Sequence, residues 1–292
     1  MTKQTALIQM HIAAILFGVS GIFGNLIASD SFVISMGRSI FAIFAMTLLS
    51  LHFRYIPWRI PLKTFYTLVI AGILLAAHWV TFFYAIKVGN VAMATLGFAC
   101  FPACVALFEM LFFKDKITNV EYCLLLCVSI GLIMVTPSFD LSNGGTLGLL
   151  WGIASGILYG ASVVVNRYNL KSTTGVQICW WQCTVVLIIL LPFTITSIPS
   201  ISKMDWLWIA CLGLLCTGLS YYLFISSLTA INAKTASIII ALEPVYAIFG
   251  AWILFSEQPS IRTIIGGVVI ILAVAWAGLQ KQTNNTTKPV IE

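Results

Sequence analysis

The sequence has very little charge. Asp, Glu, Lys and Arg together make up 8% of its 292 residues, whereas a soluble domain carries about a quarter of its residues as charged side chains. Hydrophobic residues make up 60% of the chain, and they form long runs with little of the alternation that a membrane β-barrel needs. The composition therefore excludes a soluble protein and predicts an all-α, polytopic membrane protein.

Motifs for metal, redox or cofactor chemistry are also missing. The sequence contains no HExxH, no paired aspartates and no CxxC. Its eight cysteines lie in pairs inside apolar runs, where helical spacing seldom suits a disulfide, so we interpret them as small packing residues. No cofactor or metal is expected. Because the basic residues are scattered singly, no nucleic-acid partner is expected either.

Ten apolar runs can be separated along the chain, most of them near the 20 or so residues that a helix needs to cross a bilayer. No small-residue cleavage site follows the first run, so we interpret it as a retained span and not a signal peptide. Residues 281–292 form a polar tail that we expect to be disordered and cytoplasmic. The ten runs cover about residues 6–28, 32–53, 64–87, 91–112, 119–136, 146–167, 175–197, 204–230, 234–255 and 260–280.

The basic residues predict the orientation of these runs. With the N-terminus in the cytoplasm, eleven Lys and Arg residues fall in cytoplasmic segments and three in outer loops. Since cytoplasmic loops carry the excess of Lys and Arg, both termini are predicted to be cytoplasmic. We expect a multi-pass protein of the inner (cytoplasmic) membrane, surrounded by lipid bilayer and present as a monomer or weak dimer.

The chain repeats itself at a distance of 142 residues, a shift that aligns Pro102 with Pro244. The two repeats, residues 1–141 and 142–280, hold five runs each, and this odd number means that the second repeat enters the membrane upside down. Inverted repeats whose interrupted helices meet near the midplane are typical of transporters. We expect helix kinks at Pro102 and Pro244, because proline removes a backbone hydrogen bond.

Several short motifs occupy matching or fixed places in the two repeats. They are Phe17-Gly18-Val19-Ser20 with Tyr159-Gly160-Ala161-Ser162, Gly37-Arg38-Ser39, the mid-run prolines, and Lys114-Asp115 with Ser256-Glu257. In this order, over residues 6–280, they resemble the drug/metabolite transporter superfamily, and specifically its EamA-type ten-helix carriers. The resemblance implies a central cavity, alternating access and transport of small metabolites, amino acids prominent among them. The related four-helix multidrug proteins use a glutamate in their first helix, which this chain lacks, so their mechanism is not expected here.

Glu243 is the first candidate for a functional site, because it lies midway along the run 234–255. A charge near the midplane costs roughly 2.5–3.5 kcal/mol on insertion scales, so its carboxylate is expected to face protein or water. We interpret Glu243 as lining the cavity, where it would bind a substrate ammonium group or a coupling proton. The alternative is a structural glutamate that hydrogen-bonds the backbone groups freed by Pro244.

Arg38 is the second candidate. Its guanidinium suits a substrate carboxylate, to which it can donate two parallel hydrogen bonds. It could equally turn outward to the membrane surface, or pair with Glu109 or Glu243. Trp180 occupies the equivalent position in the second repeat, so the two halves differ here.

Aromatic side chains form the third group of candidates, because their rings stack on cationic or aromatic ligands. Trp79 and Tyr221 rank first, since the repeat places them at equivalent positions. His78, beside Trp79, is a candidate for proton coupling, although a histidine used for packing is the more ordinary interpretation. The other aromatic substrate-binding candidates are Trp180, Tyr222 and Tyr246.

The sequence therefore favours a secondary active transporter, and not an enzyme, that moves a small organic metabolite, with an amino acid and export preferred. An importer of a cationic metabolite, such as a choline-like amine or a nucleoside-derived compound, is the alternative. A channel lacks support, because no ring of like charges or filter-like loop is visible. An intramembrane enzyme is the remote alternative: Gly18-Val19-Ser20-Gly21 has the GxSG form of rhomboid-type proteases, but only His78 could serve as its base.

Overall fold

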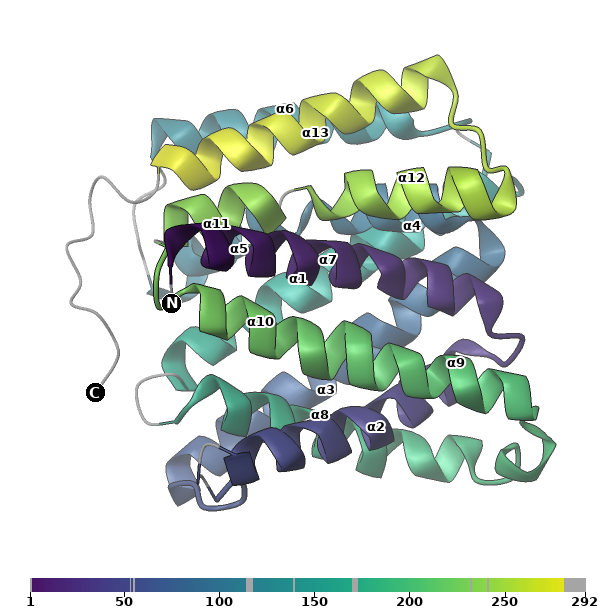
Figure 1. Cartoon of the computed structure of the whole chain (residues 1–292). Helices are drawn as coiled ribbons and strands as arrows, with labels where there is room; N and C mark the ends of the chain where they lie inside the picture. Colours follow the sequence, from purple (N-terminus) through teal and green to yellow (C-terminus); the bar gives the residue numbers. More distant parts are fainter. Residues whose placement is uncertain are drawn as a thin grey trace.

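The structure, a computed structural model, consists of helices and the turns between them (Figure 1). It describes residues 2–52, 54, 56–113, 118–138, 140–169, 173–231, 233–240 and 242–280, so the polar tail lies outside the described residues. Within those ranges no strand occurs, and seven helical segments are long and apolar enough to cross a membrane. Three shorter apolar helices accompany them. The prediction of an all-α, polytopic membrane protein is confirmed at this level.

The helices follow one another through short connections. In order they are α1 (Lys3–Leu26), α2 (Ser31–His52), α3 (Leu62–Val88), α4 (Val91–Phe98), α5 (Phe101–Phe113), α6 (Asn119–Val135), α7 (Gly144–Asn169), α8 (Gly175–Thr194), η1 (Ile198–Ser200), α9 (Lys203–Gly213), η2 (Leu214–Leu219), α10 (Ser220–Ser227), α11 (Ala233–Ile240), α12 (Glu243–Phe255) and α13 (Ile261–Gln280).

Two of the predicted runs are interrupted near their middles. The run 91–112 divides into α4 and α5, and the run 234–255 divides into α11 and α12. Pro102 and Pro244 each occupy the second position of the downstream helix. At that position the missing N–H of proline costs no helical hydrogen bond. The prolines therefore mark the start of a new helix, where the sequence suggested a kink within a continuous one.

The run 204–230 is irregular in a different way. It consists of α9, the six-residue π-helix η2 and α10. A π-turn inserts one extra residue into the helical ladder, and such turns are frequent at functional sites. The equivalent part of the first repeat, in α3, is regular α-helix.

The start of α4 is capped from two directions. The side chain of Asn90 accepts a hydrogen bond from the N–H of Met93 at 2.8 Å. The carboxylate of Glu257, which follows α12, faces the N–H groups of Val91 and Ala92 and interacts with them electrostatically. A negative charge is stabilised at a helix N-terminus, so Glu257 ties the end of α12 to the beginning of α4.

The helices form a bundle in which distant parts of the sequence lie side by side. Figure 1 shows α6 and α13 together at one edge, and α2 and α8 at the opposite edge. Between these edges, α3 packs on α7, and α1 packs on both α10 and α12. Because α12 also contacts α4, the two interrupted segments meet in the interior.

A row of glycines on α7 allows a close approach of α4 and α5. Glycine recurs every four residues at Gly148, Gly152, Gly156 and Gly160. A Cβ atom built on Gly152 would lie 2.5 Å from the carbonyl oxygen of Ala94 in α4. One built on Gly156 would lie 2.7 Å from the sulfur atom of Cys100, between α4 and α5. Small residues in such rows let helices touch backbone to backbone in membranes.

We expect Gly152→Ala to lower the free energy of unfolding by about 1–3 kcal/mol, the usual effect of overpacking a well-packed interior. The added methyl group meets backbone, which cannot rotate away. The measurement is the melting temperature of the detergent-solubilised protein. Gly267→Ala is the matched control, because a Cβ there would first meet a methyl group of the flexible Leu96 side chain at 3.1 Å. Equal melting temperatures for the two variants would contradict the tight α4–α7 contact.

Candidate functional site

Arg38 lies in the interior of the bundle, on α2, with 8% of its surface exposed. Its guanidinium carbon lies 4.2 Å above the centre of the Trp79 ring and 5.8 Å from that of Phe83. Its Nε donates a hydrogen bond to the hydroxyl oxygen of Thr217 at 2.9 Å. The arginine therefore neither turns outward to the membrane surface nor pairs with Glu109, which instead contacts Arg167 at 2.9 Å.

Thr217 owes its place to the π-helix η2. Its hydroxyl donates a hydrogen bond of 3.4 Å to the carbonyl oxygen of Leu212, five residues earlier, within a segment wound by i to i+5 backbone hydrogen bonds. The widened turn points the Thr217 hydroxyl toward α2, where it accepts the Arg38 hydrogen bond. Stacking on Trp79 and bonding to Thr217 together fix the plane of the guanidinium.

Glu243 is the first residue of α12, directly after the interruption between α11 and α12. Gly18 of α1 packs against this turn, since a Cβ atom on Gly18 would lie 2.8 Å from the carbonyl oxygen of Glu243. The carboxylate of Glu243 retains part of its accessible surface. The glycine motif of α1 thus positions the backbone that carries the acid.

Arg38 and Glu243 interact electrostatically but do not touch. Among the described residues the one ion pair within 4.0 Å is that between Arg167 and Glu109. The Nη donors of Arg38 have no hydrogen-bond partner in the described part of the chain. They are nevertheless not fully buried, so a ligand could reach them. Burying a charge without a partner is costly. Arg38 and Glu243 thus place opposite charges in the same interior, and the Arg38 Nη groups and the Glu243 carboxylate both remain able to form hydrogen bonds with a ligand.

Aromatic rings from α3, α4, α5 and α7 border this region. The rings of Phe98 and Phe101 are stacked with their centres 5.1 Å apart, and both contact Tyr159, at 5.5 and 5.2 Å. Tyr159 interacts electrostatically with Arg38 and Glu243. The two sides of the α4–α5 interruption therefore contribute to one aromatic cluster with Tyr159, the ring that interacts with both charged residues.

His78 is held firmly by its neighbours. Its Nδ1 lies 2.7 Å from the hydroxyl of Ser155, and its ring contacts Phe98 at 5.1 Å and Tyr159 at 4.8 Å. The same serine hydroxyl lies 3.2 Å from the His78 carbonyl oxygen. A histidine so enclosed suits packing of α3 on α7, and its part in proton coupling stays a prediction.

The structure places the other predicted aromatic residues in separate surroundings. Tyr221 packs against the same hydrophobic core as Trp79 and Tyr159, and its hydroxyl lies beside Gly175 at the start of α8. Trp180 donates its indole N–H to Thr47 at 3.0 Å and contacts Trp58 and Trp181. Tyr246 shares a hydrogen bond of 3.0 Å with the Nδ1 of His11 on α1, and Tyr222 faces a groove beside α2.

The α1–α2 connection is held by a carboxylate that was not singled out from the sequence. Asp205, 6% exposed, accepts hydrogen bonds from the N–H of Ala28 at 3.1 Å and the N–H of Ser29 at 2.9 Å. The hydroxyl of Ser29 donates a third, at 2.6 Å. The ammonium group of Lys87 donates to the carbonyl of Ile27 in the same connection. We call Asp205, Ala28 and Ser29 the Asp205 clasp.

The chain is similar to known proteins both in sequence and in fold. The sequence matches the model of the EamA-like transporter family over residues 4–136 and again over residues 146–279. A crystal structure of another protein shares the fold, with a TM-score of 0.68 at 17% identity, covering 97% of this chain and 99% of the other. That likeness concerns the fold alone.

Curated relatives are named as transporters. The uncharacterized transporter YxxF of Bacillus subtilis is 24% identical over 96% of this chain and 91% of its own length. An uncharacterized transporter of Archaeoglobus fulgidus is 27% identical over 91% of this chain and 94% of its own length. The pseudopaline exporter CntI of Pseudomonas aeruginosa is 26% identical over 70% of this chain and 72% of its own length.

Proposed function

Because this chain belongs to the EamA-like transporter family, we propose that it is a secondary active transporter that moves a small organic metabolite by alternating access. An amino acid is the class that the candidate site fits best, and export is the preferred direction. The relatives are named transporters, and one of them is named an exporter. These names favour transport over an enzymatic activity.

The proposed architecture is ten membrane-spanning helices in two inverted repeats, residues 1–141 and 142–280. The protein would lie in the inner (cytoplasmic) membrane, with both termini on the cytoplasmic side. The family model matches the chain twice, as a duplicated protein would. The interruptions before α5 and α12 also fall 142 residues apart. Interrupted helices that meet in the interior are a feature of duplicated transporters.

Recognition of a zwitterion rests on one observation: Arg38 and Glu243 face the same interior without pairing. A substrate carboxylate would accept hydrogen bonds from the Nη groups of Arg38. The substrate ammonium group would bind the carboxylate of Glu243, and its side chain would lie against Phe98, Phe101 and Tyr159. One ligand with both charges would satisfy both residues.

A cationic substrate taken up by an importer is the second candidate, since Glu243 and the aromatic rings suit an amine equally well. Arg38 argues against it, because a second cation would be placed beside a fixed positive charge. Glu243 is also our candidate for binding a coupling proton when substrate is absent. We propose that the protein works as a monomer or weak dimer within the lipid bilayer.

Alternating access requires that the two ends of the bundle open in turn. We propose that the Asp205 clasp closes one end, since it joins α9 to the α1–α2 connection. A carboxylate that accepts several hydrogen bonds holds a loop more firmly than a neutral group does. The clasp would release when the bundle opens at that end.

We expect Asp205→Asn to lower the free energy of unfolding by about 1–3 kcal/mol, because an amide cannot accept all three donated hydrogen bonds and leaves a buried donor unpaired. Ser29→Ala removes one of the three and should cost less. The melting temperature of the detergent-solubilised protein measures both. Asp30→Asn is the control, because exposed Asp30 caps α2 outside the clasp, and a larger loss there than at Asp205 would contradict this role.

The proposed function is tested with the purified protein in liposomes. Vesicles loaded with an unlabelled amino acid should accumulate the same labelled amino acid by exchange, and the rate should saturate with concentration. Candidates for this assay come from thermal-shift screening, because a ligand that binds the folded state raises the melting temperature as its concentration rises. Absence of exchange for every amino acid, with exchange of an amine, would transfer the assignment to the cationic alternative.

A further inference from the structure

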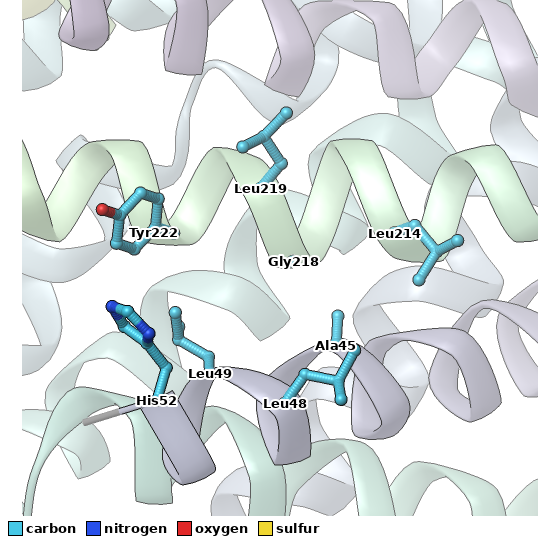
Figure 2. Close-up of a pocket in the computed structure, with 8 residues that line it drawn as sticks. All are labelled: Ala45, Leu48, Leu49, His52, Leu214, Gly218, Leu219 and Tyr222. Carbon is cyan, nitrogen blue, oxygen red and sulfur yellow. The ribbon is translucent and has the colours of Figure 1, made fainter. Parts of the chain in front are cut away.

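A groove lies on the surface of the bundle between α2 and the η2–α10 segment (Figure 2). Its volume is about 320 Å³. Both walls belong to segments long and apolar enough to cross a membrane, so in a bilayer the groove opens to lipid. Its lining consists of Ala45, Leu48, Leu49, His52, Leu214, Gly218, Leu219 and Tyr222.

The groove is polar at one end and apolar along the rest of its length. Figure 2 shows His52 and Tyr222 together at one end, and Ala45 with Leu214 toward the other. His52 is the last residue of α2, so the polar end lies where the helix reaches the membrane surface. A molecule with a polar head and a long apolar tail matches this arrangement.

The chain beyond the polar end is basic. Arg54 is exposed, and Arg59 and Lys63 follow in the same connection. The sequence has no Asp or Glu between Asp30 and Glu109, so no acid of this stretch neutralises these charges. Basic residues beside a membrane span attract anionic lipid headgroups.

We propose that the groove binds one anionic phospholipid. An acyl chain lies between Leu48 and Leu219, along the apolar walls. The phosphate lies at the end marked by His52 and Tyr222, where Arg54 adds positive charge. This site is separate from the proposed transport site and does not depend on it.

The position of the groove suggests what the lipid does. Leu214, Gly218 and Leu219 of its wall belong to η2, the π-helix whose Thr217 holds Arg38. At Gly218 this wall approaches α2 closely, since a Cβ atom there would lie 2.5 Å from that of Ala45. A lipid in the groove therefore braces, from outside, the segment that positions Arg38 inside.

Native mass spectrometry of the purified full-length protein tests the proposal, with phosphatidylglycerol and phosphatidylcholine of identical acyl chains as probes. We expect one phosphatidylglycerol to remain bound under conditions that remove phosphatidylcholine. Leu48→Trp, which fills the groove from its rim, should abolish this retention. Leu51→Trp is the matched control, because Leu51 is on the same helix, is similarly exposed and does not line the groove; it should retain the lipid.

A second variant tests the headgroup. Arg54→Gln should reduce the preference for phosphatidylglycerol over phosphatidylcholine about fivefold, the effect of one basic residue at an anionic membrane surface. Equal retention of both lipids by the unaltered protein would overturn the proposal, as would equal lipid retention by Leu48→Trp and Leu51→Trp. Many weakly bound lipids without a single retained one would indicate annular lipid only. A dimer lost in Leu48→Trp would show that a second copy of the chain covers the groove, which also overturns the lipid assignment.

Discussion

Glu243→Gln is expected to lower the apparent affinity for substrate at least about 30-fold, while the protein remains monodisperse in detergent. Removing one partner of a buried, hydrogen-bonded charge pair costs 2 kcal/mol or more, which corresponds to that factor. Glutamine has the same shape as glutamate, so packing against Gly18 is preserved and the loss reports on charge. Transport in liposomes, measured across a range of substrate concentrations, gives the affinity.

Glu109→Gln is the matched control for this substitution. It removes another carboxylate from a predicted membrane span, but one that pairs with Arg167 and not with Arg38. Its transport should stay within a factor of about two of the unaltered protein, as expected for a partly exposed ion pair, worth ~0–1 kcal/mol, that lies away from the proposed substrate site. If Glu243→Gln transported as well as Glu109→Gln, the assignment of Glu243 to the substrate would be wrong.

Arg38→Lys is expected to lower the affinity for a carboxylate-bearing substrate about 10- to 100-fold, although the positive charge is kept. The ammonium group of lysine cannot donate two parallel hydrogen bonds to a carboxylate. It also lacks the planar guanidinium that stacks on Trp79 and bonds to Thr217. The loss of one charge-assisted hydrogen bond, about 1.5–3 kcal/mol, gives this range. Binding of the unaltered and substituted proteins to the same amino acid, followed by thermal shift, measures it.

Two comparisons separate recognition of the carboxylate from a general loss of structure. The first uses the amine that remains when the carboxylate is removed from the substrate, and its weak binding should be the same in both proteins. The second uses Thr217→Val, which keeps the shape of residue 217 but removes the hydroxyl that holds Arg38. It should produce a smaller loss than Arg38→Lys. A loss that is equal for amino acid and amine would indicate damage to the fold.

The class of protein and its family could be predicted from the sequence, because they follow from composition, run length and the order of motifs. The interruptions before Pro102 and Pro244 were only partly predicted. Proline suits both a kink inside a helix and the first turn of a new helix, and the residues before it do not distinguish the two. The structure decides the matter by starting α5 and α12 one residue before each proline.

Residue type singled out Glu243 and Arg38, and repeat symmetry singled out Trp79, but their part in substrate binding stays a prediction. The groups that hold them could not be predicted. Thr217 could not be predicted as the partner of Arg38, because its equivalent in the first repeat is the apolar Leu75. The π-helix that positions it also leaves no periodic pattern in the sequence. Asp205 lies near the end of a span, where acids are usually solvated, so its burial could not be expected. Trp180 and Tyr246 were chosen for their type, whereas their partners Thr47 and His11 depend on contacts between distant helices.

The central claim is that Arg38 and Glu243 bind the two charged ends of one substrate. Exchange in liposomes with leucine, with the amine that lacks its carboxylate and with the acid that lacks its amino group tests this claim most directly, once screening has identified leucine or a similar amino acid as a ligand. We predict exchange of the amino acid and little or none of either analogue, because each analogue leaves one buried charge unpaired. Exchange of the amine at a rate equal to that of the amino acid would contradict the claim.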